Sequence, residues 1–558
     1  MRARPAALAL ALIASATALA GCGRGASAPP GRGAPRYFGS LHPPAGQVFR
    51  FNNGAEPEHL DPALASGQPD GRITRALFEG LVVSDPRTLE PAPGHAYRWE
   101  ISADGRDYTF HLRPGLVWSD RAPLTARDFE WSWKRVLDPA TGSRYAGLLF
   151  PVANAEAYNS GRLADADAVG IRASDDSTLV VRLADPTPHF LHLAALYTCL
   201  PVPRHAVERY GDRWTQPENI VGNGPFLLRR WEARARLVLE RNPTYWDAAA
   251  VRLERVVAYS VDDAATSTNL YKAGMLDWSP SGYIPSQYLP YMRGYADFRS
   301  APQQTVYFYS INVTRAPLDD VWVRRALTYA LDRETLARRV LRGTRPAWGR
   351  FAPGGYPGYE PPPEIAYDPA RARECLSRAG YPGGQGFPKI EILINTSDDR
   401  RRVAEAVQAM WKQTLGIPVG VTNLEWATYL DATAKLKYQV AVRNWIGDYP
   451  DPSTFLNCYR SGDGNNRTGW SSGPYDRLLA AAQGEGDPAA RLRLLSRAEA
   501  ILLDEAPVIP VYQFVTHELV KPYVRGLYAT PLDYHPLKSV WIDHGGATGA
   551  NAAARGAP

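Results

Sequence analysis

Cysteine is scarce in this chain, which holds only four among 558 residues. Cys22 lies near the N-terminus, and the other three, Cys199, Cys375 and Cys458, are so widely spaced that at most one disulfide bond can form between them. A free buried thiol is the default interpretation for these three cysteines, and one disulfide stays the alternative. The ten histidines include no His-x-x-x-His pair and no cysteines cluster, so neither a zinc site nor another cofactor is expected.

Acidic residues are absent before residue 47, where five arginines stand. Subtracting these five charges from the formal net charge of +6 leaves +1 for the rest of the chain. A body so close to neutral does not suggest a nucleic-acid surface. Aromatic residues are plentiful, with 15 Trp and 30 Tyr, which suits large, mostly apolar ligand clefts as well as packed cores.

Long apolar runs are also missing, apart from one near the N-terminus. The run from Leu8 to Ala20 follows Arg2 and Arg4 and, at about thirteen residues, is typical of a signal-peptide core and too short to span a bilayer. It ends in Leu19-Ala20-Gly21-Cys22, which resembles a bacterial lipobox, whose cysteine receives a lipid and becomes the new N-terminus. Residues 1–22 therefore predict export and a lipid anchor at Cys22. The alternative is simple secretory cleavage with Cys22 incidental.

Residues 23–46 are predicted to form a flexible tether, because Gly, Pro, Ala and Arg dominate them without periodicity. Such a tether would reach roughly 25 to 30 Å. The tail 545–558 is of low complexity and is predicted to be disordered. The remainder is long enough for two or three hydrophobic cores, so several domains are expected.

Hydrophobic periodicity predicts a body in which strands and helices alternate, a mixed α/β fold. A hairpin is expected where two alternating segments flank Ala103-Asp104-Gly105, and Thr125 with Asp128 is typical of a capping box. The predicted strands are 48–52, 97–100, 108–112, 178–183, 236–240, 256–260, 389–395 and 419–424. The predicted helices are 72–81, 125–137, 323–341, 404–415, 474–482 and 491–504.

The segment 443–455 sets one carboxylate, Asp448, among aromatic and turn-forming residues. Residues 440–442 are typical of the end of a buried strand, and the Gly and Pro residues that follow exclude a helix. Asp448 is therefore expected on a loop at a strand's carboxyl end, where α/β domains usually bind ligands. An acidic surface turn rich in proline is the alternative.

Several further segments resemble blocks of the extracytoplasmic peptide-binding receptors of bacterial ABC importers, solute-binding protein family 5. In chain order they are 108–120, 124–129, 219–226, 240–247, 323–333 and 508–512. The resemblance implies a two-lobed periplasmic-binding-protein-like α/β fold, with hinged lobes and an extra domain inserted in lobe one. The implied ranges are 47–77, 199–300 and 516–544 for lobe one, 78–198 for the insert and 301–515 for lobe two, with hinges near 307–312 and 512–517.

The same resemblance implies a ligand site. In peptide-binding relatives the Asp of the Trp-x-x-Asp-Tyr loop takes the peptide's α-ammonium group, and here that position is Asp448. The predicted ligand-binding residues are Asp448, Trp445, Trp426, Tyr145, Gly67, Gln68, Tyr309, Asn444, Ile446, Gly447 and Arg443. For the aromatic residues, plain core packing is the alternative. Thr433 and Val442 stand where those receptors carry arginines for the peptide's C-terminal carboxylate, and Arg443 could compensate.

An enzyme is not expected. The segment 469–473 matches Gly-x-Ser-x-Gly, but no buried strand precedes it and Pro474 follows, so it lacks the context of a nucleophile elbow. The expected function is capture of short peptides in the periplasm or at the cell surface and their delivery to an ABC permease. A lipid-anchored monomer without nucleic-acid partners is expected. The alternatives are a sensor that uses the same cleft and a receptor for a metal chelate, haem or a sugar.

Overall fold

The computed structural model describes residues 35–545, apart from the side chains of Asp398, Trp426 and Ala427. The fold belongs to one compact unit, residues 37–558. The predicted signal segment with Cys22, the first part of the predicted tether and nearly all of the predicted tail lie outside the described residues. No helix in the described part of the chain is long and apolar enough to cross a membrane.

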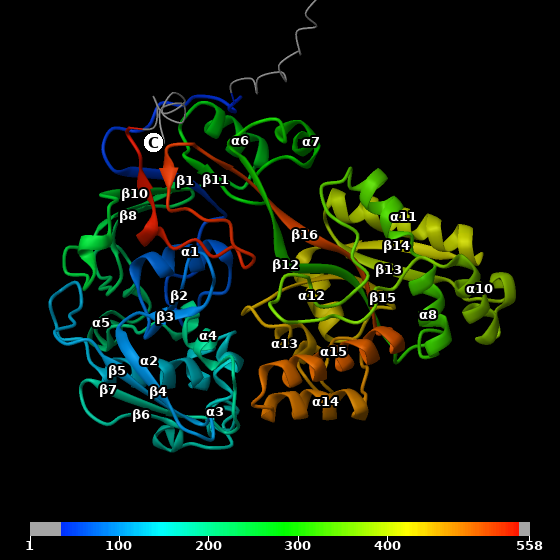
Figure 1. Ribbon diagram of the computed structural model, residues 1–558, viewed down its shortest axis with the longest axis horizontal. Helices are drawn as coiled ribbons and strands as arrows, with labels where there is room; N and C mark the ends of the chain where they lie inside the picture. The colour runs from blue at the N-terminus through cyan, green and yellow to red at the C-terminus, as the bar shows by residue number, and fades with distance from the viewer. Residues whose placement is uncertain (1–34, 546–558) are drawn as a thin grey trace, which may run out of the picture. The chain divides into compact units, whose positions relative to one another are not determined.

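A ten-stranded sheet runs through the body in the order β14-β13-β15-β12-β16-β11-β1-β10-β9-β8 (Figure 1). In that order the strands are Val419–Leu424, Ile390–Asn395, Val440–Ile446, Phe298–Ile311, Val508–Val520, Trp278–Ser279, Val48–Gly54, Arg255–Ser260, Arg236–Arg241 and Phe226–Glu232. The first three belong to predicted lobe two and the last five to predicted lobe one. Only β12 and β16 stand between these groups, so they connect the two halves of the sheet.

The two connecting strands are the longest, with 14 residues in β12 and 13 in β16, and they pair antiparallel. Their register is irregular between Pro302 and Val306 and again between Tyr307 and Phe308. Every residue from 304 to 311 is buried. Because side chains alternate along a strand, Tyr307 and Tyr309 enter one core while Val306 and Phe308 enter another. The predicted hinge segments lie in this pair.

The predicted inserted domain contains a second sheet of four strands, in the order β4-β5-β7-β6. These are Ala96–Ile101, Asp107–Leu112, Thr178–Arg182 and Ile171–Ala173. The predicted hairpin is confirmed as β4 and β5. Helix α2 (Ala126–Leu137) packs on this sheet, and its predicted N-terminus is confirmed, since the Thr125 N–H donates to Asp128 Oδ2 at 2.8 Å. This region also contains the paired strands β2 (Val82–Ser84) and β3 (Pro91–Pro93) and the short helices α3 (Ala155–Asn159) and α4 (Phe190–Ala194).

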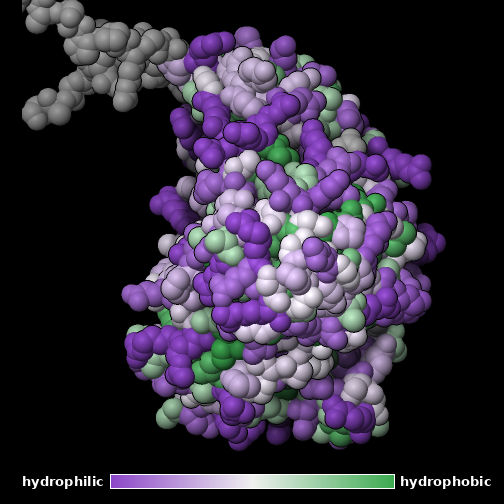
Figure 2. All heavy atoms as spheres, turned by 90° about the vertical axis from the view of Figure 1, so that its right-hand side faces the viewer, coloured by the Kyte–Doolittle hydropathy of each residue, from purple (hydrophilic) through white to green (hydrophobic). Residues whose placement is uncertain are grey.

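Helices cover the sheet in predicted lobe two. They are α8 (Val321–Tyr329), α9 (Arg333–Thr335), α10 (Pro369–Arg378), α11 (Asp398–Leu415), α12 (Trp426–Ala434), α13 (Ser453–Leu456), α14 (Gly473–Gly484) and α15 (Pro488–Glu505). Buried side chains of α8, α10 and α11 form one core with β12, β13 and β15. Figure 2 shows the right-hand side of Figure 1, where α8, α10 and α11 lie. This face is mostly hydrophilic, with small hydrophobic areas scattered over it. These helices therefore turn their apolar sides to the sheet.

The prediction of a single helix over residues 323–341 is wrong. Helix α8 ends at Tyr329, and α9 and a π-helical turn (Leu336–Val340) follow. The break has a local cause, because Asp332 Oδ1 accepts a hydrogen bond from the Thr335 N–H at 2.9 Å and so starts a new helix. Arg333 then donates to the Pro510 carbonyl at 2.7 Å.

The remaining elements belong mainly to predicted lobe one. They are α1 (Gln68–Leu77), α5 (Arg204–Tyr210), α6 (Ala264–Lys272), α7 (Leu289–Met292), β17 (Val524–Arg525) and β18 (Trp541–Ile542). Within the range predicted as tether, Phe38 contacts this region: its N–H donates to Asp297 Oδ1 at 2.9 Å, and its ring stacks near Tyr271. The described end of the predicted tether is therefore attached to the body.

Candidate functional site

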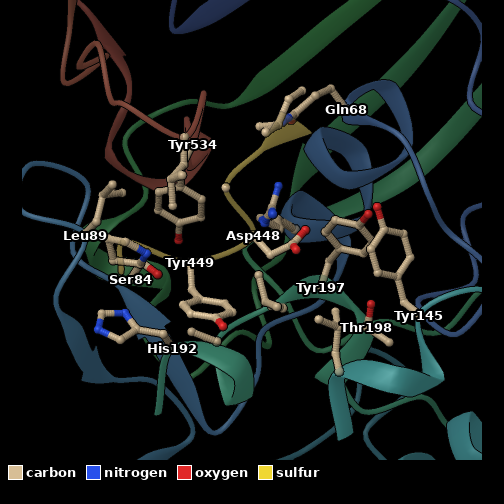
Figure 3. A pocket seen from close by; sticks show the side chains of 18 of the residues that line it. Gln68, Ser84, Leu89, Tyr145, His192, Tyr197, Thr198, Asp448, Tyr449 and Tyr534 are labelled. Atoms are coloured by element: carbon tan, nitrogen blue, oxygen red, sulfur yellow. The ribbon is translucent and has the colours of Figure 1, made fainter. Parts of the chain in front are cut away.

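A cavity of about 380 Å³ opens between segments that are far apart in the sequence (Figure 3). Its walls come from the start of α1, from predicted inserted-domain residues, from the end of β15 and from the C-terminal segment. The lining residues are Ser66, Gly67, Gln68, Arg75, Ser84, Leu89, Tyr145, Leu148, His192, Ala195, Leu196, Tyr197, Thr198, Leu532, Tyr534 and the run from Asn444 to Pro450.

Asp448 enters the cavity because β15 ends just before it. The last bond of the ladder runs from the Gly447 N–H to the Gln304 carbonyl at 2.9 Å, and the Asp448 N–H then donates to Thr454 Oγ1 at 3.0 Å. A Cβ at position 447 would lie 3.2 Å from the Phe455 ring and 3.3 Å from the Thr454 methyl, so the chain turns tightly there. The loop position predicted for Asp448 at the strand's carboxyl end is confirmed.

Asp448 is a partly buried carboxylate that pairs with no cation in the described part of the chain. Burial raises its pKa to about 6, and a hydrogen bond from the Thr454 hydroxyl, 3.4 Å from Oδ2, opposes that shift. Among the described residues, no Lys, Arg or His forms an ion pair with it. Figure 3 shows Asp448, Tyr197 and Tyr145 around the same space. The site therefore presents a negative charge that the protein itself does not neutralise.

Asp451, three residues later, has the opposite environment. Both of its oxygens accept hydrogen bonds from Arg491, at 2.7 and 2.9 Å. Burial alone would raise the pKa of Asp451, but the Arg491 guanidinium outweighs burial and holds that pKa at about 2. Asp451 is therefore a structural residue of the loop rather than a ligand group.

The structure brings most of the predicted site residues together. The cavity is lined by Gly67, Gln68, Tyr145, Asn444, Trp445, Ile446, Gly447 and Asp448. Tyr309 does not line it, because its ring is fully buried between Tyr307 and Trp411, with centroids 5.9 and 6.1 Å away. Arg443 is not among the lining residues either, and it donates to the Asn465 carbonyl at 3.0 Å. The side chain of Trp426 lies outside the described residues.

Sequence reasoning missed the wall that the predicted inserted domain and the C-terminal segment provide. Tyr197, Thr198 and His192 come from residues around α4, and Tyr534 comes from the C-terminal loop (Figure 3). Tyr449 was missed although it directly follows Asp448, and its ring stacks on His189 with centroids 4.4 Å apart and planes within 6°. The Asp-Tyr pair was the available signal for Tyr449, whereas nothing in the local sequence marks the others.

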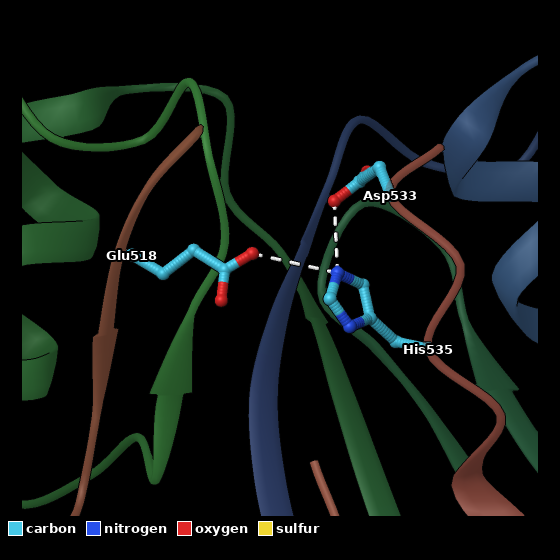
Figure 4. Close-up of side chains that lie close together, drawn as sticks. All are labelled: Glu518, Asp533 and His535. Carbon is cyan, nitrogen blue, oxygen red and sulfur yellow. Dashed lines mark hydrogen bonds and ion pairs between the residues drawn. The ribbon is translucent and has the colours of Figure 1, made fainter. Parts of the chain in front are cut away.

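One buried group has the residue types of a metal site (Figure 4). Glu518 of β16, Asp533 and His535 offer ligand-type atoms within 4.8 Å of one another. Burial would lower the pKa of His535, but the carboxylates of Glu518 and Asp533 outweigh it and raise the pKa to about 9. At neutral pH the Nε2 atom therefore carries a proton, 2.9 Å from Asp533 Oδ1 and 3.4 Å from Glu518 Oε1. With Arg72 bonded to Asp533 at 2.8 Å, two cations balance two anions without a metal ion.

In the Gly-x-Ser-x-Gly segment, the serine bonds to another serine. The Ser471 hydroxyl shares a hydrogen bond with the Ser461 hydroxyl at 2.9 Å. Among the described residues, no histidine bonds to it. The segment leads into α14, as a loop before a helix. The three described cysteines, Cys199, Cys375 and Cys458, are buried and free, which agrees with the default interpretation of their spacing.

Known proteins are similar to this chain in sequence and fold. The family model of bacterial extracellular solute-binding proteins, family 5, matches residues 90–467. The periplasmic oligopeptide-binding protein OppA of Salmonella typhimurium is 37% identical over 507 residues, covering 89% of this chain and 92% of the relative. The oligopeptide-binding protein OppA of Bacillus subtilis is 36% identical over 506 residues, covering 88% and 91%. A protein of Escherichia coli described as a probable deoxycholate-binding periplasmic protein, YgiS, is 37% identical over 509 residues, covering 89% and 94%.

Solved structures agree with the sequence comparison. The murein tripeptide binding protein MppA of Escherichia coli superposes with a TM-score of 0.79 at 34% identity, covering 89% of this chain and 99% of that one. OppA of Haemophilus influenzae, in complex with RPPGFSPFR, superposes with a TM-score of 0.77 at 32% identity, covering 90% and 99%. The fold is therefore the predicted two-lobed periplasmic-binding-protein-like α/β fold.

Proposed function

Because this chain belongs to family 5 of the bacterial extracellular solute-binding proteins, we propose that it captures short peptides outside the cytoplasm and delivers them to an ABC import permease. Relatives that cover about nine-tenths of the chain are named for oligopeptide binding, which supports a peptide as the ligand. The observation that carries the proposal is the Asp448 carboxylate, which faces a cavity and has no cationic partner among the residues that the structure describes.

A peptide's α-ammonium group fits this carboxylate. A charge-assisted hydrogen bond at about 2.8 Å would replace the water that Asp448 loses on burial, so a free N-terminus gains affinity and a blocked one leaves the charge unpaired. The cavity volume of about 380 Å³ lies at the lower end of the range for small-molecule sites, which favours short peptides. The main chain at Gly67 and the end of β15 offers groups for pairing with a peptide backbone, which would ignore side-chain identity.

The membrane anchor is part of the same proposal. The lipobox ending at Cys22 would tie the receptor to a membrane, where a permease can receive its ligand, and the periplasmic location in relatives' names supports export. A Cys22→Ser variant is expected to leave the membrane fraction for the soluble extracytoplasmic fraction. Retention of that variant in the membrane would contradict the lipid anchor.

Native mass spectrometry of protein lacking residues 1–22, purified without unfolding, tests the ligand. The wild type is expected to carry a ladder of short-peptide masses, and Asp448→Asn is expected to lose it. The control is Asp431→Asn, which removes an exposed carboxylate of α12 that pairs with Lys435. In titrations, N-acetylation of Ala-Ala-Ala should weaken binding about 100-fold in the wild type and hardly at all in Asp448→Asn. A single non-peptide mass, or failure of every peptide to bind, would mean that the ligand class is wrong.

A further inference from the structure

Arg75 is a second charged residue of the cavity. It lies in the last turn of α1, and its guanidinium carbon lies 4.9 Å from the Tyr197 ring centroid and 5.2 Å from that of Tyr534. All three residues line the cavity, which Figure 3 shows for the two tyrosines. One turn earlier, a Cβ at Gly71 would lie 3.1 Å from both Arg75 Nη1 and the Tyr197 ring, so the absence of a side chain there gives the guanidinium its place.

Arg75 has no anionic partner in the part of the chain that the structure describes. No carboxylate forms an ion pair with it, no acceptor takes a hydrogen bond from it, and its Nε is enclosed by protein without a partner. Burial accordingly lowers the pKa of Arg75. Arg72 on the same helix shows the usual arrangement, since it donates to Asp533 Oδ2 at 2.8 Å and to the Asn53 carbonyl at 3.2 Å.

Aromatic rings do not satisfy a guanidinium. Their faces attract the cation by roughly 0.5 to 2 kcal/mol, but they accept none of the hydrogen bonds that its five N–H groups can donate. The planar fork of N–H groups matches the two oxygens of a carboxylate, which it binds more strongly than any neutral acceptor. The partner that Arg75 lacks is therefore a carboxylate, which a ligand in the cavity would supply.

We propose that Arg75 is the anion-binding residue of this cavity and that the ligand is a peptide carrying a carboxylate, held by its ammonium group at Asp448 and by its carboxylate at Arg75. This inference rests on the proposed function. Asp448 and Arg75 line one cavity but form no ion pair with each other, so both stay available to a ligand. A zwitterionic ligand neutralises both charges at once. The carboxylate is either the peptide's C-terminus or an acidic side chain.

The test pairs a charge removed from the ligand with a charge removed from the protein. Alanine peptides of two to five residues are titrated as free acids and as C-terminal amides, against wild type, Arg75→Met and Arg75→Lys. The control is Arg127→Met, which removes an exposed arginine that pairs with Asp176 and does not line the cavity. If the C-terminus binds Arg75, amidation should weaken binding at least tenfold at one length in wild type and the control, and less than twofold in Arg75→Met. Arg75→Lys should keep part of the effect.

A second arm identifies the source of the carboxylate. Amidated peptides with Asp at each position in turn are compared with their Asn counterparts, and an acidic side chain that reaches Arg75 should give a preference for Asp that Arg75→Met abolishes. An equal loss of affinity for all peptides in Arg75→Met, or a carboxylate preference that survives in it, would overturn the assignment. If N-acetylation still weakens binding while no carboxylate matters, the peptide function stands and the Arg75 inference fails. If no peptide binds at all, both fail.

Discussion

The cavity and the interior around His535 use buried charge in opposite ways. Around His535, two cations and two anions balance one another in a closed group of side chains. In the cavity, the carboxylate of Asp448 and the guanidinium of Arg75 each lack an oppositely charged partner among the described residues. Burial of charge is therefore not what identifies the site. The distinguishing feature is charge that lacks both an oppositely charged partner and strong hydrogen bonds among the described residues, unlike the buried Glu499, whose carboxylate accepts hydrogen bonds from the Phe351 and Ala352 N–H groups. A ligand can then complete it.

The largest expected effect comes from the two aspartates of one loop. Asp451→Asn leaves the Arg491 guanidinium buried without its anion and is expected to lower the free energy of unfolding by about 3 to 5 kcal/mol. Asp448→Asn is expected to leave it unchanged or to raise it by about 1 kcal/mol, since burial has already made the ionised form of Asp448 unfavourable. Urea denaturation of ligand-free protein measures both. Equal destabilisation by the two substitutions would erase the distinction between paired and unpaired charge.

The balanced group predicts a pH dependence of stability. The pKa of His535 is raised to about 9 in the folded protein, whereas it is about 6.5 in the unfolded chain. The proton on His535 therefore stabilises the folded protein fully below about pH 6.5, and this stabilisation is lost as the pH rises through about 9. Between pH 6.5 and 8, wild type should lose about 2 kcal/mol of unfolding free energy relative to His535→Gln. Denaturation at several pH values checks this. Parallel pH profiles for the two proteins would show that His535 does not hold an extra proton.

The unbalanced carboxylate of Asp448 predicts a smaller pH dependence, which concerns peptide affinity. A bound ammonium group keeps Asp448 ionised, so affinity should be constant above the free-state pKa of about 6 and fall as the pH drops below it. Affinity for Ala-Ala-Ala at pH 5 is expected to be about tenfold weaker than at pH 7.5. Isothermal titration gives the profile, and Asp448→Asn serves as the control. A profile that keeps its slope in the variant would assign the titration to another group.

The loop that presents Asp448 could be predicted from the sequence, because neighbouring residues determine it. A strand end followed by Gly447 and Pro450 leaves the chain no helical option, and the structure has this turn. The break after α8 was also locally determined, by the capping carboxylate of Asp332, but the hydrophobic pattern continues through it and hides it. Periodicity alone was therefore misleading there.

Arg75 and Tyr309 show what local sequence cannot supply. Arg75 occupies the last turn of an amphipathic helix, where an arginine is ordinary, and its lack of a partner depends on Tyr197 and Tyr534 from distant segments. Tyr309 was predicted to line the site because it resembles an aromatic position of the family, with core packing as the alternative. Its position on β12 instead points the ring at Trp411 in the core behind the sheet. Both outcomes depend on which distant segments meet.

The three buried, unpaired thiols at Cys199, Cys375 and Cys458 bear on how the protein can be handled at the bench. We expect a receptor with unsatisfied charges in its cavity to be purified with a ligand bound, and a titration would then report exchange with an unknown competitor. Denaturant can strip that occupant, and because no disulfide joins these cysteines, refolding under simple reducing conditions cannot scramble cross-links. The absence of a disulfide among these three cysteines should thus allow ligand-free receptor to be prepared by unfolding and refolding.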